Sequence, residues 1–543
     1  MTAVAGRVYT VAPGLSFLDE LARAVLTGAF ASGQLALDPL ALGDVTILLP
    51  TRRAARQLQQ SFLDASRQNA LLLPVIRPIG EASEDLTLLH ALMSREGVLG
   101  DATVPPAVGE LERRLVLATL VLKWSDTLRH ATVDETDRSV LQAAGARTPA
   151  QAMHLARELA RLIDMVETEN AELSDLESLV PDTLSEHWQQ TLEFLKIILQ
   201  FWPAHLDSVA KLSPADRRNR LILGEAARLR ATQPKGPLIV AGVTGSIPAT
   251  TELIRAVLAH DAAAVVLPGL DTAMDDVSWS RLATDNPEHP QCSLAKLLRA
   301  LDVERRDVHA LPGGVAAPAQ VRRAHLINEA MRPASTTHHW HRLGETVTAD
   351  DAQAAFAGVH RLIAPTAQDE AEAIALIMRH AAEQPGRTTA LVSPDRLLAR
   401  RVAIRLESWG IRVDDSAGRP FIKTVPGAFL DLAIEVFAQN FAPAALMALL
   451  KHPLTRLGWP ALDIRRTARI LEVGAFRAAY IGSGIDGVLA ALDRQDEAVE
   501  KGERRDRAGR RLRVEDWARA RELIEALREA YTPLIELRAT GGD

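Results

Sequence analysis

Cysteine is almost missing from this 543-residue sequence, which contains Cys292 and no other cysteine. A single thiol cannot form a disulfide within the chain, nor supply the ligands of a thiolate zinc site or an iron–sulfur cluster. The amino terminus also lacks the basic-then-apolar pattern of a signal peptide, and no apolar run is long enough to cross a bilayer. We therefore expect a cytoplasmic protein with no membrane partner, no metal and no cofactor in this chain.

Lysine is scarce as well, with eight residues in the chain, of which the first is Lys123. The phosphate-binding loop of an ATPase needs Gly-Lys followed by Ser or Thr, and Gly-Lys occurs nowhere in the sequence. A short strand at 8–11 is nevertheless followed by a loop and a helix, in the order that such a loop has. We predict a degenerate phosphate loop without ordinary ATP hydrolysis and assign no catalytic residue; its residues are Ala12, Pro13, Gly14 and Ser16.

A strand-turn-helix-strand pattern organises the middle of the chain. Residues 238–243 and 263–267 are apolar runs rich in β-branched residues, as expected for parallel strands buried on both faces. The turn Val243-Thr244-Gly245-Ser246 lies between the first strand and a helix, with Ser246 suited to cap that helix. Open α/β sheets bind anionic ligands at this kind of turn, although a purely structural turn has the same local pattern.

Two further turns carry arginine at the start of a helix. Thr51, Arg52 and Arg53 follow a predicted strand at 45–49, where positive charge opposes the helix dipole and so favours a role in binding phosphate. Arg396 and Arg400 follow a predicted strand at 389–392, and another strand is predicted at 411–413 before an acidic turn. We expect Asp414-Asp415-Ser416 to be a polar turn at the end of that strand, and a metal site is the alternative.

These patterns predict an α/β protein of tandem parallel-sheet domains with large helical insertions, the layout of a superfamily 1 helicase core. The first domain comprises 1–104 and 231–345, a helical insertion occupies 105–230, the second domain covers 346–435, and 436–543 is helical. The net charge of −7 does not by itself indicate a nucleic-acid partner, so any basic channel must be local.

The same turns resemble a known family, the AddB subunits of AddAB helicase-nucleases in their alphaproteobacterial form. The resemblance lies in Leu48-Leu49-Pro50-Thr51-Arg52-Arg53-Ala54-Ala55-Arg56, in Ala241-Gly242-Val243-Thr244-Gly245-Ser246-Ile247-Pro248-Ala249-Thr250 with Val265-Val266-Leu267-Pro268-Gly269-Leu270-Asp271, and in Ala390-Leu391-Val392-Ser393-Pro394-Asp395-Arg396 with Trp409-Gly410-Ile411 and Asp414-Asp415-Ser416-Ala417-Gly418-Arg419-Pro420. It extends from about residue 8 to the end of the chain.

The resemblance implies a non-motor, helicase-like subunit that guides a DNA strand during double-strand break repair by homologous recombination. Its partners would be an AddA-like helicase-nuclease subunit, DNA ends and single-stranded DNA. The implied DNA contacts are Thr51, Arg52, Arg53, Thr244, Gly245, Ser246, Arg396 and Arg400. The family's nuclease motif and iron–sulfur cysteines are not found in this sequence, so we expect a fragment or truncated product without nuclease activity.

Two other functions fit the same sequence. The first is a scaffold that holds the AddA-like subunit and has little contact with DNA, which the long helical stripes and the net negative charge favour. The second is a nucleotide-binding enzyme of another class that uses the turn at Thr244. Salt-dependent DNA binding, co-purification without DNA, and stabilisation by nucleotide would distinguish the three.

Overall fold

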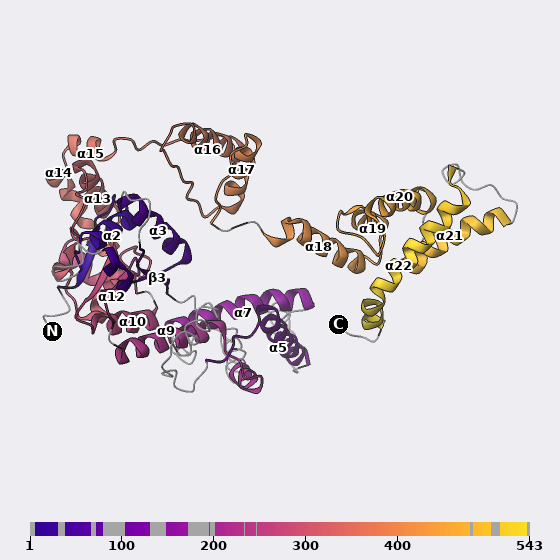
Figure 1. Ribbon diagram of the computed structural model, residues 1–543, viewed down its shortest axis with the longest axis horizontal. Helices are drawn as coiled ribbons and strands as arrows, with labels where there is room; N and C mark the ends of the chain where they lie inside the picture. The colour runs from indigo at the N-terminus through magenta and orange to yellow at the C-terminus, as the bar shows by residue number, and fades with distance from the viewer. Residues whose placement is uncertain are drawn as a thin grey trace. The chain divides into compact units, whose positions relative to one another are not determined.

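The computed structural model divides into two compact units, residues 1–360 and residues 361–543 (Figure 1). The structure describes residues 6–30, 39–66, 72–79, 104–130, 148–171, 195, 201–232, 234–245, 247–416, 418, 420–477, 482–500 and 511–539. None of the helices in these ranges combines the length and the apolar character needed to cross a bilayer.

The first unit is an α/β structure built on a six-stranded sheet in which every pairing is parallel, in the order β3-β2-β4-β5-β1-β6. The strands are β1 (Val8–Val11), β2 (Thr46–Leu49), β3 (Val75–Pro78), β4 (Leu238–Ala241), β5 (Ala263–Pro268) and β6 (His309–Ala310). The four strands predicted in this unit are confirmed to within two residues at each end. β3 and β6 were missed, because β3 is an edge strand that ends on proline and β6 has two residues, both exposed.

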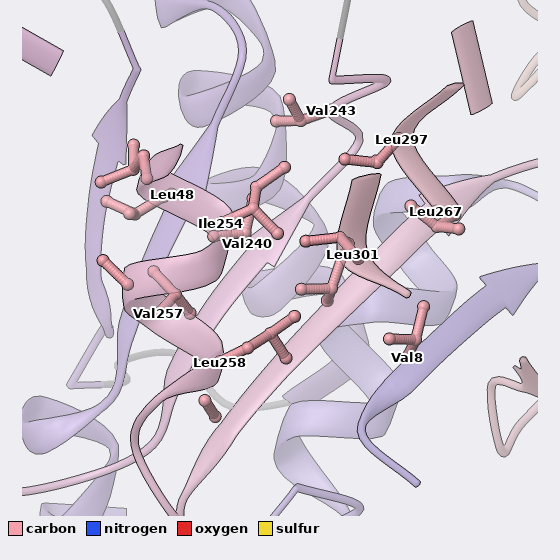
Figure 2. Close-up of a cluster of buried hydrophobic side chains, with 14 of the residues drawn as sticks. Val8, Leu48, Val240, Val243, Ile254, Val257, Leu258, Leu267, Leu297 and Leu301 are labelled. Carbon is pink, nitrogen blue, oxygen red and sulfur yellow. The ribbon is translucent and has the colours of Figure 1, made fainter. Parts of the chain in front are cut away.

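Helices cover both faces of this sheet. Along β4, Leu238 and Val240 point to one face while Ile239 and Ala241 point to the other, and all four are buried. The first face packs against α9 (Pro214–Ala231), α10 (Pro248–Leu258) and α12 (Cys292–Leu301), as the cluster in Figure 2 shows. The second face packs against α2 (Phe17–Leu26) and α3 (Arg52–Ser66). The sheet therefore lies between two apolar layers, which is why its central strands are apolar without alternation.

A block of helices separates β3 from β4 in the chain and contains α5 (Glu110–His130), α7 (Pro149–Glu169) and α9. Thr148 caps α7 by accepting a hydrogen bond of 3.2 Å from the Gln151 backbone N–H, with proline at the first helical position. Of the two tryptophans at 188 and 202, Trp188 lies outside the described residues. Trp202 itself is buried and donates to the Ser213 hydroxyl at 2.9 Å, so it belongs to the core of this block.

A buried arginine joins α5 to α7. Arg113 is fully buried and donates to both carboxylate oxygens of Asp164, at 2.9 and 3.0 Å, and to the Ala160 carbonyl at 2.8 Å. Its guanidinium also lies 5.8 Å from the centre of the Trp202 ring. Because a buried charge is tolerated only when it is paired and hydrogen-bonded, these contacts fix the register of the two helices.

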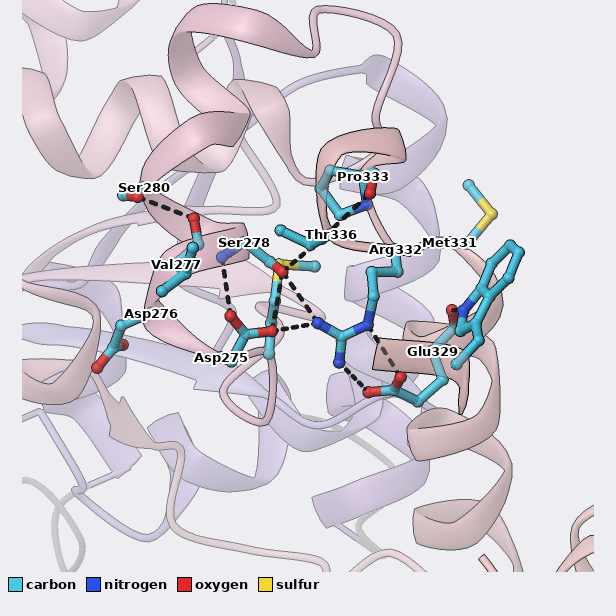
Figure 3. Close-up of polar contacts among 12 residues, drawn as sticks. Asp275, Asp276, Val277, Ser278, Ser280, Glu329, Met331, Arg332, Pro333 and Thr336 are labelled. Atoms are coloured by element: carbon cyan, nitrogen blue, oxygen red, sulfur yellow. Dashed lines mark hydrogen bonds and ion pairs between the residues drawn. The ribbon is translucent and has the colours of Figure 1, made fainter. Parts of the chain in front are cut away.

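The remaining helices of the first unit are α11 (Asp276–Asp285), α13 (Pro318–Ala330), α14 (Leu343–Thr346) and α15 (Ala349–Ala355). Asp275 caps α11 through the Ser278 N–H and also pairs with Arg332, which in turn pairs with Glu329 at 2.5 Å (Figure 3). Burial alone would raise the pKa of Asp275, but the hydrogen bonds from Ser278 and Arg332 lower it to about 2. This network ties α11 to the end of α13.

The second unit is helical in its described residues. Its helices are α16 (Ala367–Ala382), α17 (Arg396–Ser408), α18 (Val425–Ala438), α19 (Pro443–Lys451), α20 (Ala461–Leu471), α21 (Gly484–Glu500) and α22 (Val514–Ala539). Asp395 caps α17 and Gly410 ends it with a φ of +75°, both as the sequence indicates. A large apolar cluster packs α18 to α22 together, with Trp517, Leu523 and Ile524 at its centre.

The second parallel sheet expected in 346–435 is not formed by the described residues, which contain no strand in this unit. The segments at 389–392 and 411–413 belong to no helix or strand and have no ladder partner among the described residues, and Val392 is 93% exposed. Leu391, Ile411 and Val413 do pack against the apolar cluster between α16 and α17. An apolar, β-branched pattern favours the extended conformation, but a sheet also requires a neighbouring strand to supply hydrogen bonds.

Glu167 on α7 carries a pH-sensitive contribution to stability. Burial raises the pKa of its carboxyl group to about 7, against the opposing effects of the Ser213 hydroxyl and Arg113. Its Oε2 atom is buried and accepts no hydrogen bond from the described residues.

We predict that Glu167→Gln removes this pH dependence. The pKa of Glu167 in the folded protein exceeds the unfolded value of 4.5. The contribution of this carboxyl group to the free energy of unfolding is therefore fully present below pH 4.5 and is lost as the pH rises through about 7. The free energy of unfolding falls by at most about 3 kcal/mol over this range, and the neutral glutamine variant does not show this decrease. Urea unfolding at about pH 5 and about pH 8 measures the difference. Equal pH dependence of the two proteins would contradict the assignment.

Candidate nucleic-acid interface

The carboxyl ends of the strands in the first unit meet at one edge of the sheet. Because every strand is parallel, the loops that follow β1, β2, β4, β5 and β6 all leave from that edge. The register places Leu48, Val240 and Val265 side by side across three strands. The described parts of the turns predicted separately from the sequence, at 12–16, 50–53 and 243–245, therefore lie along the same edge.

Contacts around Gly242 show that three of these loops converge. Gly242 has a φ of +71°, and a Cβ atom built there would lie 3.3 Å from the Phe17 ring and 3.7 Å from Pro50. Phe17 begins the helix after β1, and Pro50 precedes the helix after β2. The residues after β4 are thus held directly against the turns that follow β1 and β2.

The Thr51 turn presents two arginines at the start of α3. Thr51, Arg52 and Arg53 are exposed, and the Thr51 hydroxyl accepts a hydrogen bond of 3.1 Å from the Ala54 N–H. Thr51 therefore has a structural role as the helix cap, and the two arginines that follow it form the exposed first turn of α3. Arginine in this position can donate paired hydrogen bonds to a phosphate group.

The turn after β4 is shaped by Gly245 rather than by serine. Gly245 has a φ of +63°, and an added Cβ would lie 2.5 Å from the Leu297 side chain. Ser246 lies outside the described residues, and the cap of α10 is Ile247, so the prediction that Ser246 caps the helix is wrong. Pro248 occupies the first helical position, which moves the cap one residue along the chain. Thr244 is partly buried at the same edge.

A side chain of the protein itself contacts the loop at 12–16, which was predicted to be a degenerate phosphate loop. Gln320, on α13, donates to the Gly14 carbonyl at 3.0 Å and accepts from the Ala317 N–H at 2.9 Å. Beside this loop, the buried Glu20 accepts a hydrogen bond of 2.8 Å from the Gly314 N–H. A filled loop with a carboxylate next to it is unfavourable for nucleotide phosphates.

Arg396 and Arg400 belong to the second unit. Arg396 is the first residue of α17 and pairs with Asp415 at 3.1 Å, so the acidic turn balances this arginine. Arg400 is exposed one turn further along the helix. Among the described residues, no three His, Cys, Asp or Glu side chains are grouped as metal ligands would be.

A cavity of about 510 Å³ was not predicted from the sequence. It lies between α11, α12 and the segment 303–308, and three arginines line it, namely Arg299, Arg305 and Arg306. Arg305 pairs with Asp276 at 2.7 Å and its guanidinium lies 5.0 Å from the centre of the Trp279 ring. The adjacent arginines at 305 and 306 could have indicated a basic site in the sequence. The helices that form the cavity around them are brought together only by the fold.

Neither a scan against protein-family models nor a search of curated proteins gives a match for this chain.

We predict that Gly245→Ala destabilises the first unit more than Gly269→Ala does. Both residues have a positive φ, so each substitution carries a strain of about 1–2 kcal/mol. At Gly269 the nearest atom, Pro13 Cγ, is 3.8 Å from the new Cβ, an ordinary contact, whereas Leu297 must move at Gly245. The clash adds about 1–3 kcal/mol to the loss at Gly245. Urea denaturation measures both, and equal losses would mean that the Leu297 contact is not restrictive.

Proposed function

We propose that this chain is a DNA-binding, helicase-like subunit that guides a strand during the processing of double-strand breaks, in the manner of the AddB subunits that it resembles. The observation that supports this most directly is the shared edge of the sheet. There the exposed Arg52 and Arg53 start a helix whose turn lies against the loops after β1 and β4. Such an edge offers both amide donors and guanidinium groups to a phosphate backbone.

A strand-binding role fits better than a motor role. A motor needs a lysine to hold the nucleotide phosphates, and the loop after β1 contains none. The Gln320 contact with Gly14 fills the same loop. These features also argue against a nucleotide-binding enzyme at this loop, so ATP hydrolysis would come from an AddA-like partner.

The second helicase-like domain is part of the same proposal. α16 and α17 pack against the segments that contain Leu391 and Ile411, as the helical layer of an α/β domain packs against its sheet. In this arrangement Arg396 and Arg400 would contribute to the DNA path, with Arg396 released from Asp415 by a competing phosphate.

A scaffold that holds the AddA-like subunit is the second candidate. It is favoured by the exposed apolar side chains of α18 and the residues before it: Phe421, Ile422, Val425, Leu430 and Ile434. Monomeric proteins seldom expose contiguous apolar patches of this kind unless a partner covers them.

We predict that replacing Arg52 and Arg53 with glutamine weakens the binding of single-stranded DNA and makes it less sensitive to salt. Each phosphate contact contributes about 0.7 to the slope of log K against log salt, so losing both lowers the slope by about 1.4. Fluorescence anisotropy with a labelled oligothymidylate across a salt series measures both effects. Thr51 is left unchanged because it caps α3.

The matched control is Arg157→Gln with Arg161→Gln, which removes the same charge from the first unit. Both arginines pair with Glu158 on the exposed side of α7. Strand binding by the sheet edge requires the control to bind like the wild type. If both double variants weaken binding equally, net charge rather than this site is responsible, and the proposal for the edge is lost.

A further inference from the structure

One helix of the second unit has an unusually basic exposed side. α20 buries Ile464, Thr467, Ala468 and Leu471 in the apolar cluster of α18 to α22. Its opposite side exposes three arginines, Arg465, Arg466 and Arg469. The structure gives none of the three an acidic partner among the residues it describes, although most arginines discussed above have one.

Lys451 and Arg477 add two more cations beside the end of this helix. Arg465, Arg469 and Glu472 follow one another at spacings of four and three residues, so they form one row on the helix surface. Glu472 accepts hydrogen bonds from Lys451 at 3.1 Å and from Arg477 at 3.0 Å, which hold the pKa of Glu472 below its usual range. A single carboxylate is thus shared by two cations, and positive charge remains in excess along the whole row.

The row is held in a fixed position. The end of α20 continues as a π-helical turn, Glu472–Phe476, in which Gly474 allows the Trp517 ring of α22 to approach closely. A Cβ atom at Gly474 would lie 3.0 Å from that ring. Such turns occur often at functional sites, and here the packing places Arg477 where it can reach Glu472.

We propose that this side of α20, which we call the α20 basic face, binds the phosphate backbone of a nucleic acid. The face consists of Arg465, Arg466, Arg469, Lys451 and Arg477 around Glu472. Like charges one turn apart destabilise a helix, and a protein with a net charge of −7 has acidic residues with which to pair them. Unpaired arginines in this position are explained by an anionic partner outside the chain.

The spacing favours a nucleic acid over an acidic protein. Arg465 and Arg469 are about 6 Å apart along the helix axis, close to twice the ~3.4 Å axial spacing of phosphates in one strand. Two arginines at this separation can each bind a phosphate with paired hydrogen bonds. The inference rests on the proposed function in that the nucleic acid would be DNA, but it concerns residues that the sheet edge does not contain.

The test uses the full chain and compares the triple variant Arg465→Gln, Arg466→Gln, Arg469→Gln with the wild type. A control with the same change in charge is Arg379→Gln, Arg521→Gln, Arg528→Gln, in which each arginine pairs with a carboxylate on the second unit. Binding of a labelled oligothymidylate is measured by anisotropy across a salt series. Circular dichroism and urea unfolding of each variant verify that the fold is retained.

We expect the α20 variant to bind at least tenfold more weakly at low salt, with a salt slope smaller by about 2, while the control stays near the wild type. An α20 variant that binds like the control would overturn the inference.

The Arg52, Arg53 variant separates the two proposals. If it binds normally while the α20 variant is weakened, the sheet edge is wrong and the α20 basic face stands, and the reverse result rejects the α20 basic face alone. Absence of binding by the wild-type chain rejects both.

Discussion

The parallel ladder between β4 and β5 is the constraint on which the first unit depends. Its residues are buried on both faces, and the two apolar layers of helices are held apart by these strands. Since all six strands have the same direction, the ladder also decides where the connecting loops emerge. A single arrangement of backbone hydrogen bonds thus determines both the core and the edge at which Arg52 and Arg53 lie.

The sequence predicts the parts of this fold that depend on local pattern. Buried strands such as β4, the cap at Thr148 and the helix end at Gly410 each follow from a few adjacent residues. β6, and the absence of a second sheet from the described residues, could not be predicted in this way, because pairing depends on a neighbouring strand that the local sequence does not reveal. The turns after β1, β2 and β4 were located correctly, since βα turns have their own residue signature, but no strand precedes the turn at Arg396 among the described residues.

The local sequence does not show which polar groups near the predicted turns are already hydrogen-bonded or paired within the protein. The contact between Gln320 and Gly14 joins residues 306 positions apart, and Arg396 meets Asp415 only through the turn after α17. Because arginine is common in this chain, the residue type alone does not show whether an arginine has a structural or a binding role. Arg113 and Arg332 are nearly enclosed and hold helices together, while the arginines of α20 are exposed without such partners. Arg113 and Arg332 therefore differ from the arginines of α20 in both pairing and burial.

The position of β1 inside the sheet has a consequence for how the protein is made. Thr10 contacts Leu267, which follows it by 257 residues, and β1 lies between β5 and β6 in the finished sheet. A ribosome adding about 5–20 residues per second needs roughly 10–50 s to reach β5. Until then Val8 and Val11 of β1 lack the neighbouring strand β5 with which β1 pairs. We expect the nascent chain to depend on chaperones during this interval, because the finished sheet buries Val8 and Val11.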